Sequence, residues 1–131
     1  MLGADGVLMG TRFWAASEAL VKEGHRQAIL RTDGDGTLRT RIPDIVRQLP
    51  WPPGFTARIR RNAFTQRWHG REEELQAAVA EEGPRYRQAA EAGDPEQTGV
   101  WFGEAAGLVH AIEPAAVIMQ RVCDEAAARL R

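Results

Sequence analysis

Cysteine is almost absent from this 131-residue chain, since Cys123 is the only one. A lone cysteine cannot form a disulfide within the chain, and such sparing use is typical of a reducing compartment. The first residues lack the basic segment and cleavage pattern of a secretory signal. We therefore expect a cytoplasmic protein.

Two other absences limit the partners that the chain can have. No apolar run approaches the roughly 20 residues that a membrane-spanning helix needs. The formal net charge is −1, so there is no surplus of positive charge to attract nucleic acid or an anionic membrane surface. The sequence therefore predicts neither a nucleic acid nor a membrane as a partner.

Metal ligands and a catalytic triad are also missing from the pattern. The histidines His25, His69 and His110 are scattered without the spacing of a zinc site. Residues 33–37 read DGDGT, but the sixth position of a calcium loop starting there is Leu38, where an EF-hand needs glycine. No nucleophile elbow or triad order is present. We expect no metal site.

What the sequence does contain is a short apolar run beside glycine. Val7, Leu8 and Met9 are bounded by glycines, which is typical of a buried parallel strand, although a buried helix segment shares the pattern. Gly10 and Thr11 follow directly, and a helical pattern begins a few residues later. A strand that ends in this way presents free backbone N–H groups and a hydroxyl to a phosphate, although an ordinary turn explains the same residues.

Several separate stretches, in the expected order, resemble the nitronate monooxygenase family, formerly called 2-nitropropane dioxygenases. Residues 2–13 read LGADGVLMGTRF and are similar to the family's last barrel strand and phosphate loop. Residues 58–72 read RIRRNAFTQRWHGRE and residues 100–108 read VWFGEAAGL, and both resemble segments of the family. The shorter pieces TLRTR (37–41) and PWPPG (50–54) are similar to it as well. The resemblance covers essentially the whole chain.

Members of that family are FMN-dependent (β/α)8 barrels, so the resemblance implies that this chain forms part of an FMN site. By that likeness Gly10 and Thr11 hold the FMN phosphate, and Met9 lies beside the cofactor through its backbone. Gly103 and Glu104 are implied to approach the cofactor or the substrate cavity, although many relatives have glutamine where Glu104 stands. These five residues are our candidate cofactor-binding residues.

The reaction that the resemblance implies is the flavin-dependent oxidation of an alkyl nitronate by O2, which gives a carbonyl compound and nitrite. In the family, the base that removes the α-proton of the substrate is a histidine on an earlier barrel strand. No histidine of this chain matches it, so no catalytic residue is assigned here. Two alternatives stay open: a flavin-dependent enoyl-ACP reductase II, whose phosphate loop is similar, and a non-catalytic helical interaction module.

The expected fold class is mostly α with one or two short strands. A (β/α)8 barrel needs about 250 residues, and a last barrel strand near the start of this chain leaves no room for the other seven. We therefore expect a C-terminal fragment of an FMN-binding TIM barrel with its helical second domain. The expected segments are 1–31 (last barrel strand, FMN-phosphate turn and following helix), 32–57 (extended, proline-rich connection) and 58–131 (helical region). As an isolated fragment we expect it to be inactive, with weak or no FMN binding, and to form a homodimer through the exposed strand.

Helix formers and breakers predict the elements of the first half of the chain. We expect a helix over 17–30, an extended piece over 37–42 and a helical turn over 43–48. Residues 50–54 are expected to form a rigid, packed loop, which we favour over a proline-rich ligand for SH3 or WW modules.

In the second half, residues 58–68 are expected to be helical, with a basic face in solvent. Two helices are expected to meet at the break formed by Gly83 and Pro84, and the second is expected to end at Gly93, Asp94 and Pro95. Pro114 is expected to open the last helix, with an apolar stripe that places Met119 and Cys123 in or near the core. The members of that stripe are Ala115, Ile118, Met119, Val122, Ala126 and Leu130.

Overall fold

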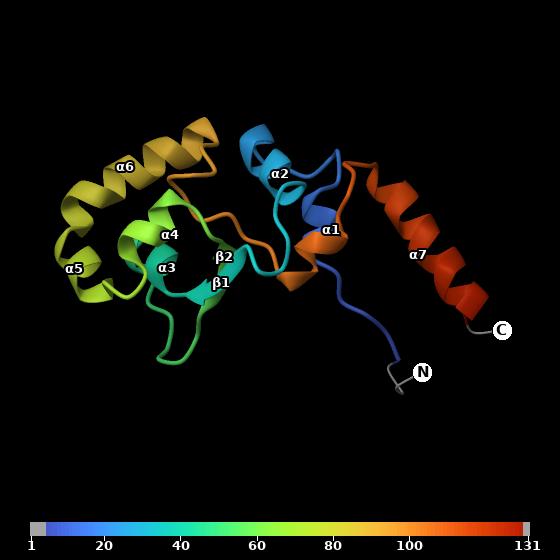
Figure 1. Cartoon of the computed structure of the whole chain (residues 1–131), viewed down its shortest axis with the longest axis horizontal. Helices are drawn as coiled ribbons and strands as arrows, with labels where there is room; N and C mark the ends of the chain where they lie inside the picture. The colour runs from blue at the N-terminus through green and yellow to red at the C-terminus, as the bar shows by residue number, and fades with distance from the viewer. Residues whose placement is uncertain (1–4, 130–131) are drawn as a thin grey trace.

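The computed structural model describes residues 5–129, and this part of the chain is mostly helical with one two-stranded sheet (Figure 1). The expected fold class is confirmed. None of the described helices combines the length and the apolar composition of a membrane span. In chain order the elements are α1 (Thr11–Trp14), α2 (Glu23–Ile29), β1 (Thr37–Thr40), α3 (Ile42–Val46), β2 (Ala57–Arg60), α4 (Ala63–Trp68), α5 (Glu72–Ala77), α6 (Val79–Ala92), the 3-10 helix η1 (Glu104–Leu108) and α7 (Ala115–Arg129).

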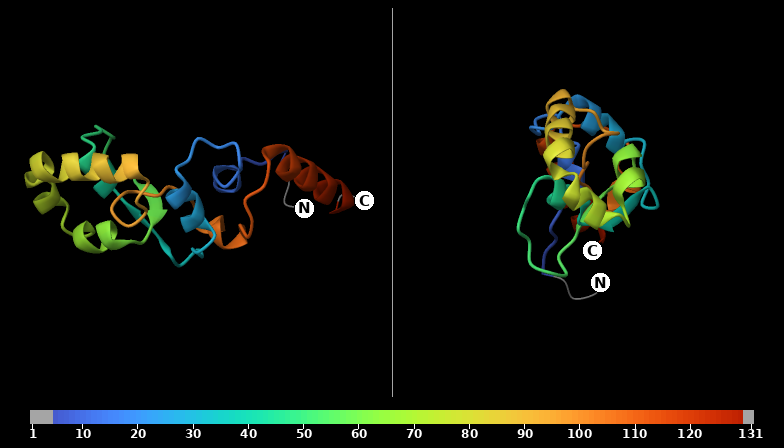
Figure 2. Two further views of the ribbon diagram at one scale, coloured as in Figure 1. Left: turned by 90° about the horizontal axis from the view of Figure 1, so that it is seen from above. Right: turned by 90° about the vertical axis from the view of Figure 1, so that its left-hand side faces the viewer.

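These elements form an elongated molecule. Helices α3 to α6 gather beside the sheet at one end, and α1, α2 and η1 lie in the middle. Helix α7 extends at the other end, as the view from above shows (Figure 2).

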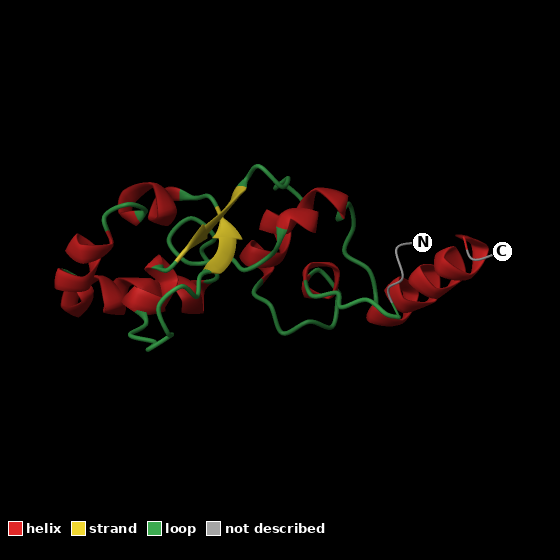
Figure 3. Cartoon of the chain, turned by 90° about the horizontal axis from the view of Figure 1, so that it is seen from below, coloured by secondary structure: helices red, strands yellow, loops and turns green. Residues whose placement is uncertain are grey.

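The sheet explains why residues 57–60 are not helical. Strands β1 and β2 pair antiparallel, with Leu38 opposite Ile59 (Figure 3). The alternation in β2 buries Ile59 completely, and this residue also forms a bridge with Trp101. The expected helix over 58–68 is therefore wrong at its start. It begins at Ala63, after Asn62, whose side chain accepts a hydrogen bond from a backbone N–H of the first turn.

One core lies among α3, α4, α5 and α6. The rings of Phe64 and Tyr86 lie 5.1 Å apart there. The Tyr86 hydroxyl accepts a hydrogen bond from the backbone N–H of Gly99 at 2.9 Å, and burial raises the pKa of Tyr86 to about 12. This hydrogen bond joins the segment after α6 to α6 itself. The buried members of this core are Ile42, Val46, Phe64, Trp68, Leu75 and Tyr86.

The boundary between α5 and α6 lies at Ala78, so the expected break at Gly83 and Pro84 is wrong. Pro84 lies inside α6, although it has no N–H to donate to the helix. Gly83 is buried, and the helix continues through both residues of the expected break. Helix α6 ends as predicted at Gly93, which has a left-handed φ of 73°.

A second core joins the beginning of the chain to the segment around η1. The rings of Trp14 and Phe102 meet edge to face, with centroids 5.9 Å apart. This packing crosses the segment limits that we placed after residues 31 and 57. The buried members are Ala15, Ala28, Ile29, Val100, Phe102, Ala106 and Val109.

The two ends of the segment 16–113 lie side by side. Ala16 and Glu113 form a parallel bridge, and the backbone N–H of Ser17 donates to the carbonyl of Glu113 at 3.0 Å. The Glu18 carboxylate accepts a hydrogen bond from the backbone N–H of Ala115 at 3.0 Å. Residues 16–113 therefore form a lobe whose two ends are joined by these contacts. The segment 5–10 and α7 lie outside it (Figure 1).

Two expectations for the first 30 residues are wrong. The expected helix over 17–30 begins only at Glu23, and Leu20 is exposed instead of buried. Residues 7–9 form neither a strand nor a helix in the described chain, and Val7 and Leu8 are 80% and 102% exposed. A strand needs at least one partner strand for its backbone hydrogen bonds, and no strand of the described residues pairs with this segment.

Helix α7 follows Pro114 as predicted, but most of its apolar stripe is uncovered. Of that stripe, Ile118 is the buried residue within the described range. Met119 is 52% exposed and Cys123 is exposed, so their expected positions in the core are wrong. Leu130 lies outside the described residues.

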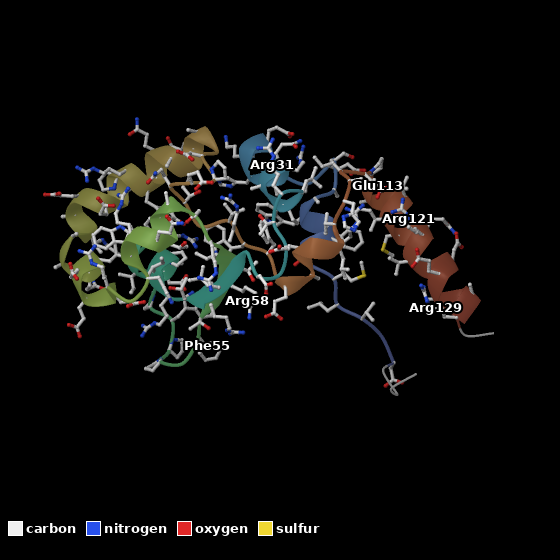
Figure 4. The ribbon with its side chains drawn as sticks, in the orientation of Figure 1. Arg31, Phe55, Arg58, Glu113, Arg121 and Arg129 are labelled. Carbon is white, nitrogen blue, oxygen red and sulfur yellow. The ribbon has the colours of Figure 1, made fainter. Side chains whose placement is uncertain are left out.

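The loop between α3 and β2 is also more exposed than expected. Trp51 is 53% exposed and Phe55 is 59% exposed, and their stacked rings lie 6.1 Å apart. The loop projects from the lobe, where Phe55 is labelled in Figure 4. The expected packed loop over 50–54 is therefore wrong.

Candidate functional site

Two of the predicted cofactor-binding segments meet in space. The hydroxyl oxygen of Thr11 accepts a hydrogen bond from the backbone N–H of Gly103 at 2.9 Å. Gly10 precedes α1 and Gly103 precedes η1, so the contact joins the starts of two short helices. The sequence separates these segments by 92 positions, and the fold brings them together.

A hollow of about 540 Å³ opens beside this contact, between the segment before α1, η1 and α7. Met9, Gly10 and Thr11 line it, together with apolar side chains of η1 and α7. Gly103 and Glu104 are not among the described residues that line it. The structure therefore places three of the five candidates at the hollow, whereas Gly103 contacts Thr11 and Glu104 does not line the hollow.

Glu104 points toward the sheet instead. Its carboxylate pairs with Arg58 Nη2 at 2.9 Å, and its side chain is 70% exposed. Arg58 also donates from Nη1 to the hydroxyl of Thr37 at 3.1 Å. Glu104 thus has a partner within the lobe, and its charge is directed away from Gly10.

A cluster of charged side chains flanks the turn at Gly10 and Thr11. Arg12 and Arg121 both donate to the carboxylate of Glu113. Glu113 and Arg121 are labelled in Figure 4. The hydrogen bond from Arg121 holds the pKa of Glu113 below its ordinary value, so this carboxylate is ionised at neutral pH.

The sequence analysis missed this cluster. One signal was present, because Arg12 directly follows the glycine and threonine of the proposed phosphate turn. Arg121 gave no signal, since it lies more than 100 residues later in a helix that looks like an ordinary amphipathic one.

The turn offers the donors that a phosphate needs. The first N–H groups of a helix have no acceptor within the helix, and the Thr11 hydroxyl keeps its own proton to donate because its oxygen is the acceptor for Gly103. A Cβ at Gly10 would meet no atom within 4 Å, so the turn is open. Arg12 lines the hollow next to the turn and adds a positive charge there. These residues fit a phosphate group.

The histidines lie elsewhere. His25 is buried beside the second core. Its ring stacks on Trp14, and its Nε2 lies 3.0 Å from the hydroxyl of Thr98. Burial lowers the pKa of His25, and so the neutral ring is favoured. Nδ1 of His69 lies 3.3 Å from a threonine hydroxyl of β1. No group of metal-binding side chains gathers within residues 5–129.

The comparison with protein families decides the assignment. The model described as nitronate monooxygenase matches residues 1–125. The chain belongs to the nitronate monooxygenase family. The family is one of oxidoreductases, and the resemblance noted in the sequence is confirmed.

Curated nitronate monooxygenases are similar over nearly the whole chain. The nitronate monooxygenase npaC of Metarhizium robertsii is 35% identical, and the match covers 98% of this chain and 37% of that protein. The nitronate monooxygenase of Neurospora crassa is 31% identical, with 99% of this chain and 34% of that protein covered. The chain therefore spans about a third of the length of these curated relatives.

Solved structures share the arrangement of this family member. FabK from Thermotoga maritima matches with a TM-score of 0.70 and 27% identity, covering 94% of this chain and 38% of that one. A point mutant of the same protein matches with a TM-score of 0.65 and 26% identity, covering 98% and 35%.

Proposed function

We propose that this chain supplies the phosphate-binding turn and the adjoining lobe of an FMN-dependent nitronate monooxygenase, which oxidises alkyl nitronates with O2 to a carbonyl compound and nitrite. The observation that carries the proposal is the hydrogen bond between Thr11 and Gly103 beside an open hollow. It joins two segments that the family resemblance assigns to the cofactor site.

Bound FMN would supply the redox chemistry, and the residues of this chain would hold and orient it. The backbone around Gly10 and the hydroxyl of Thr11 would donate to the phosphate. Gly103 would act through Thr11, because its N–H occupies the threonine oxygen. Glu104 would stay with Arg58 at the sheet. The proton-abstracting base is expected outside this chain.

The chain alone is expected to bind FMN weakly or not at all and to have no activity. The segment before Gly10 has no strand partner among the described residues, and Val7 and Leu8 stand in solvent. Without neighbouring strands the turn is not held in one position, so the affinity for the phosphate is low.

A chimera tests the proposal: this chain replaces the matched third of the Neurospora crassa nitronate monooxygenase. We expect the chimera to retain flavin absorbance through gel filtration and to release nitrite from propyl-2-nitronate in air without NAD(P)H. The 131-residue chain is the control and is expected to do neither. A folded chimera that carries no flavin contradicts the proposal, and consumption of NAD(P)H in place of nitrite release favours the reductase alternative.

Two substitutions at one position sharpen this test. Gly10→Ala adds only a methyl group to the open turn, whereas Gly10→Asp adds a negative charge where we place the phosphate. FMN affinity of the chimera is expected to fall in the order wild type, Gly10→Ala, Gly10→Asp. Equal affinities for the alanine and aspartate variants would show that no anion binds at this turn.

A further inference from the structure

Two arginines share one carboxylate beside the turn at Gly10. Arg121 of α7 donates from Nη1 to Glu113 Oε2 at 2.9 Å and from Nη2 to Oε1, so the pair is bidentate. Arg12 of α1 donates from Nη2 to the same carboxylate. The carboxylate is four-fifths buried, and it fixes both guanidinium groups at one wall of the hollow.

The charges of the side chains around Glu113 do not cancel. The hydrogen bond from Arg121 keeps the pKa of Glu113 low, so one negative charge faces two positive ones. Glu125 also lines the hollow, but its carboxylate pairs with Arg129 Nη1 at 3.1 Å. The net charge of the five side chains is therefore +1, from three arginines (Arg12, Arg121 and Arg129) and two glutamates (Glu113 and Glu125). This excess positive charge would attract an anion.

The two arginines differ in what they have left to donate. A guanidinium has five N–H donors, and the bidentate pair uses two of those on Arg121. The Arg121 side chain is 50% exposed and lines the hollow, so its remaining donors are accessible. The Arg12 side chain is only 17% exposed, and its free Nη1 is covered by protein atoms. Both arginines line the hollow, but Nη1 of Arg12 is covered, so the more exposed Arg121 offers the accessible donors to a ligand there.

We propose that Arg121 binds the phosphate of FMN, and that Glu113, anchored by Arg12, positions the Arg121 guanidinium for this contact. This inference rests on the proposed function. It assigns one wall of the phosphate site to α7. A dianionic phosphate matches the excess positive charge, and the planar guanidinium can donate two parallel hydrogen bonds to it. Riboflavin lacks the phosphate, so Arg121 does not contribute to its affinity.

The chimera with the Neurospora crassa enzyme allows the contact to be measured. Flavin fluorescence gives the dissociation constants for FMN and riboflavin in the wild-type chimera and in Arg121→Gln. We expect the substitution to weaken FMN binding about tenfold or more and to leave riboflavin binding unchanged. Arg31→Gln is the control, because Arg31 is exposed and is not among the described residues that line the hollow, and it is expected to alter neither constant.

Glu113→Gln separates positioning from net charge. This change removes a negative charge, so a purely electrostatic role of the cluster predicts tighter FMN binding. We expect weaker FMN binding, because the guanidinium of Arg121 loses its bidentate anchor. Tighter binding would overturn the positioning role of Glu113.

The outcomes distinguish this inference from the proposed function. If the wild-type chimera binds FMN no better than riboflavin, the phosphate site itself is wrong. If it prefers FMN and Arg121→Gln keeps that preference, the inference about Arg121 alone is overturned.

Discussion

The hydroxyl of Thr11 accepts the backbone N–H of Gly103, so the start of α1 fixes the start of η1. The donor is partly buried, and removing its acceptor leaves it unpaired unless water replaces the oxygen. This single contact therefore contributes to the geometry of both proposed cofactor segments.

Thr11→Val is expected to destabilise the chain by about 1–2 kcal/mol, because the valine keeps the shape of threonine but cannot accept the hydrogen bond. Thr11→Ser keeps the oxygen and is the control, with an expected loss below about 0.5 kcal/mol. Urea unfolding followed by circular dichroism measures both free energies. A valine variant as stable as the serine variant would show that the contact does not form in solution.

Glu104→Gln is expected to be nearly neutral. The ion pair with Arg58 is solvent-exposed on the glutamate side, and such pairs contribute about 0–1 kcal/mol. The glutamine amide oxygen can still accept a hydrogen bond from Arg58. Urea unfolding of Glu104→Gln and Glu104→Ala tests this. A large loss of stability in Glu104→Gln would mean that the negative charge of Glu104 has a role that the glutamine amide cannot replace.

The sequence predicted the fold best where local signals were strong. Gly93 ended α6 as predicted because its left-handed backbone suits glycine, and Pro114 preceded α7. The resemblance predicted two cofactor segments that the fold brings together. Local patterns failed at residues 57–60, where pairing with β1 turned a helix-like sequence into a strand.

The remaining failures arise from tertiary packing that the sequence does not display. Residues 7–9 have the apolar pattern of a buried strand, but pattern alone does not provide the neighbouring strands. Met119 and Cys123 lie on an amphipathic helix, yet the described residues cover little of its apolar face. The Arg12, Glu113 and Arg121 cluster joins positions that are far apart in the chain, so no spacing rule reveals it.

Stability is expected to fall as the pH drops, because of His25. Burial lowers its pKa below the ordinary value of 6.5, so the unfolded state binds the proton more readily than the folded state does. The stabilisation is fully present above pH 6.5 and is lost below it, by up to about 1.4 kcal/mol per pH unit. The backbone carbonyl and charge of Asp94 oppose this shift, and the charge of Lys22 adds to it.

Urea unfolding at two pH values, one on each side of 6.5, measures this loss in the wild-type chain. His25→Gln is expected to remove most of the difference, whereas His110→Gln keeps it because His110 is exposed. Equal pH dependence in both variants would place the effect on other groups.

Gly93→Ala is expected to cost more stability than Gly70→Ala. Both glycines have a positive φ, of 73° and 82°, which costs an alanine about 1 kcal/mol. A Cβ at Gly93 would also lie 2.8 Å from Cβ of Lys22, whereas a Cβ at Gly70 meets nothing within 4 Å. Since the Lys22 atom is next to the backbone, the chain itself must move. Urea unfolding should give a difference of about 1 kcal/mol or more between the variants, and equal losses would mean that α2 and the end of α6 are not packed as described.

The exposed loop between α3 and β2 is expected to contribute little to the stability of this chain. Trp51 and Phe55 are more than half exposed and contact each other, so the double substitution to serine removes little buried apolar surface. We expect a change within about 0.5 kcal/mol. Phe64→Ala is the contrast, because Phe64 is 2% exposed in the core among α3, α4, α5 and α6 and its truncation is expected to cost about 3–5 kcal/mol. If urea unfolding shows a loss above about 1.5 kcal/mol for the loop variant, the two rings pack against the lobe in solution as the sequence had predicted.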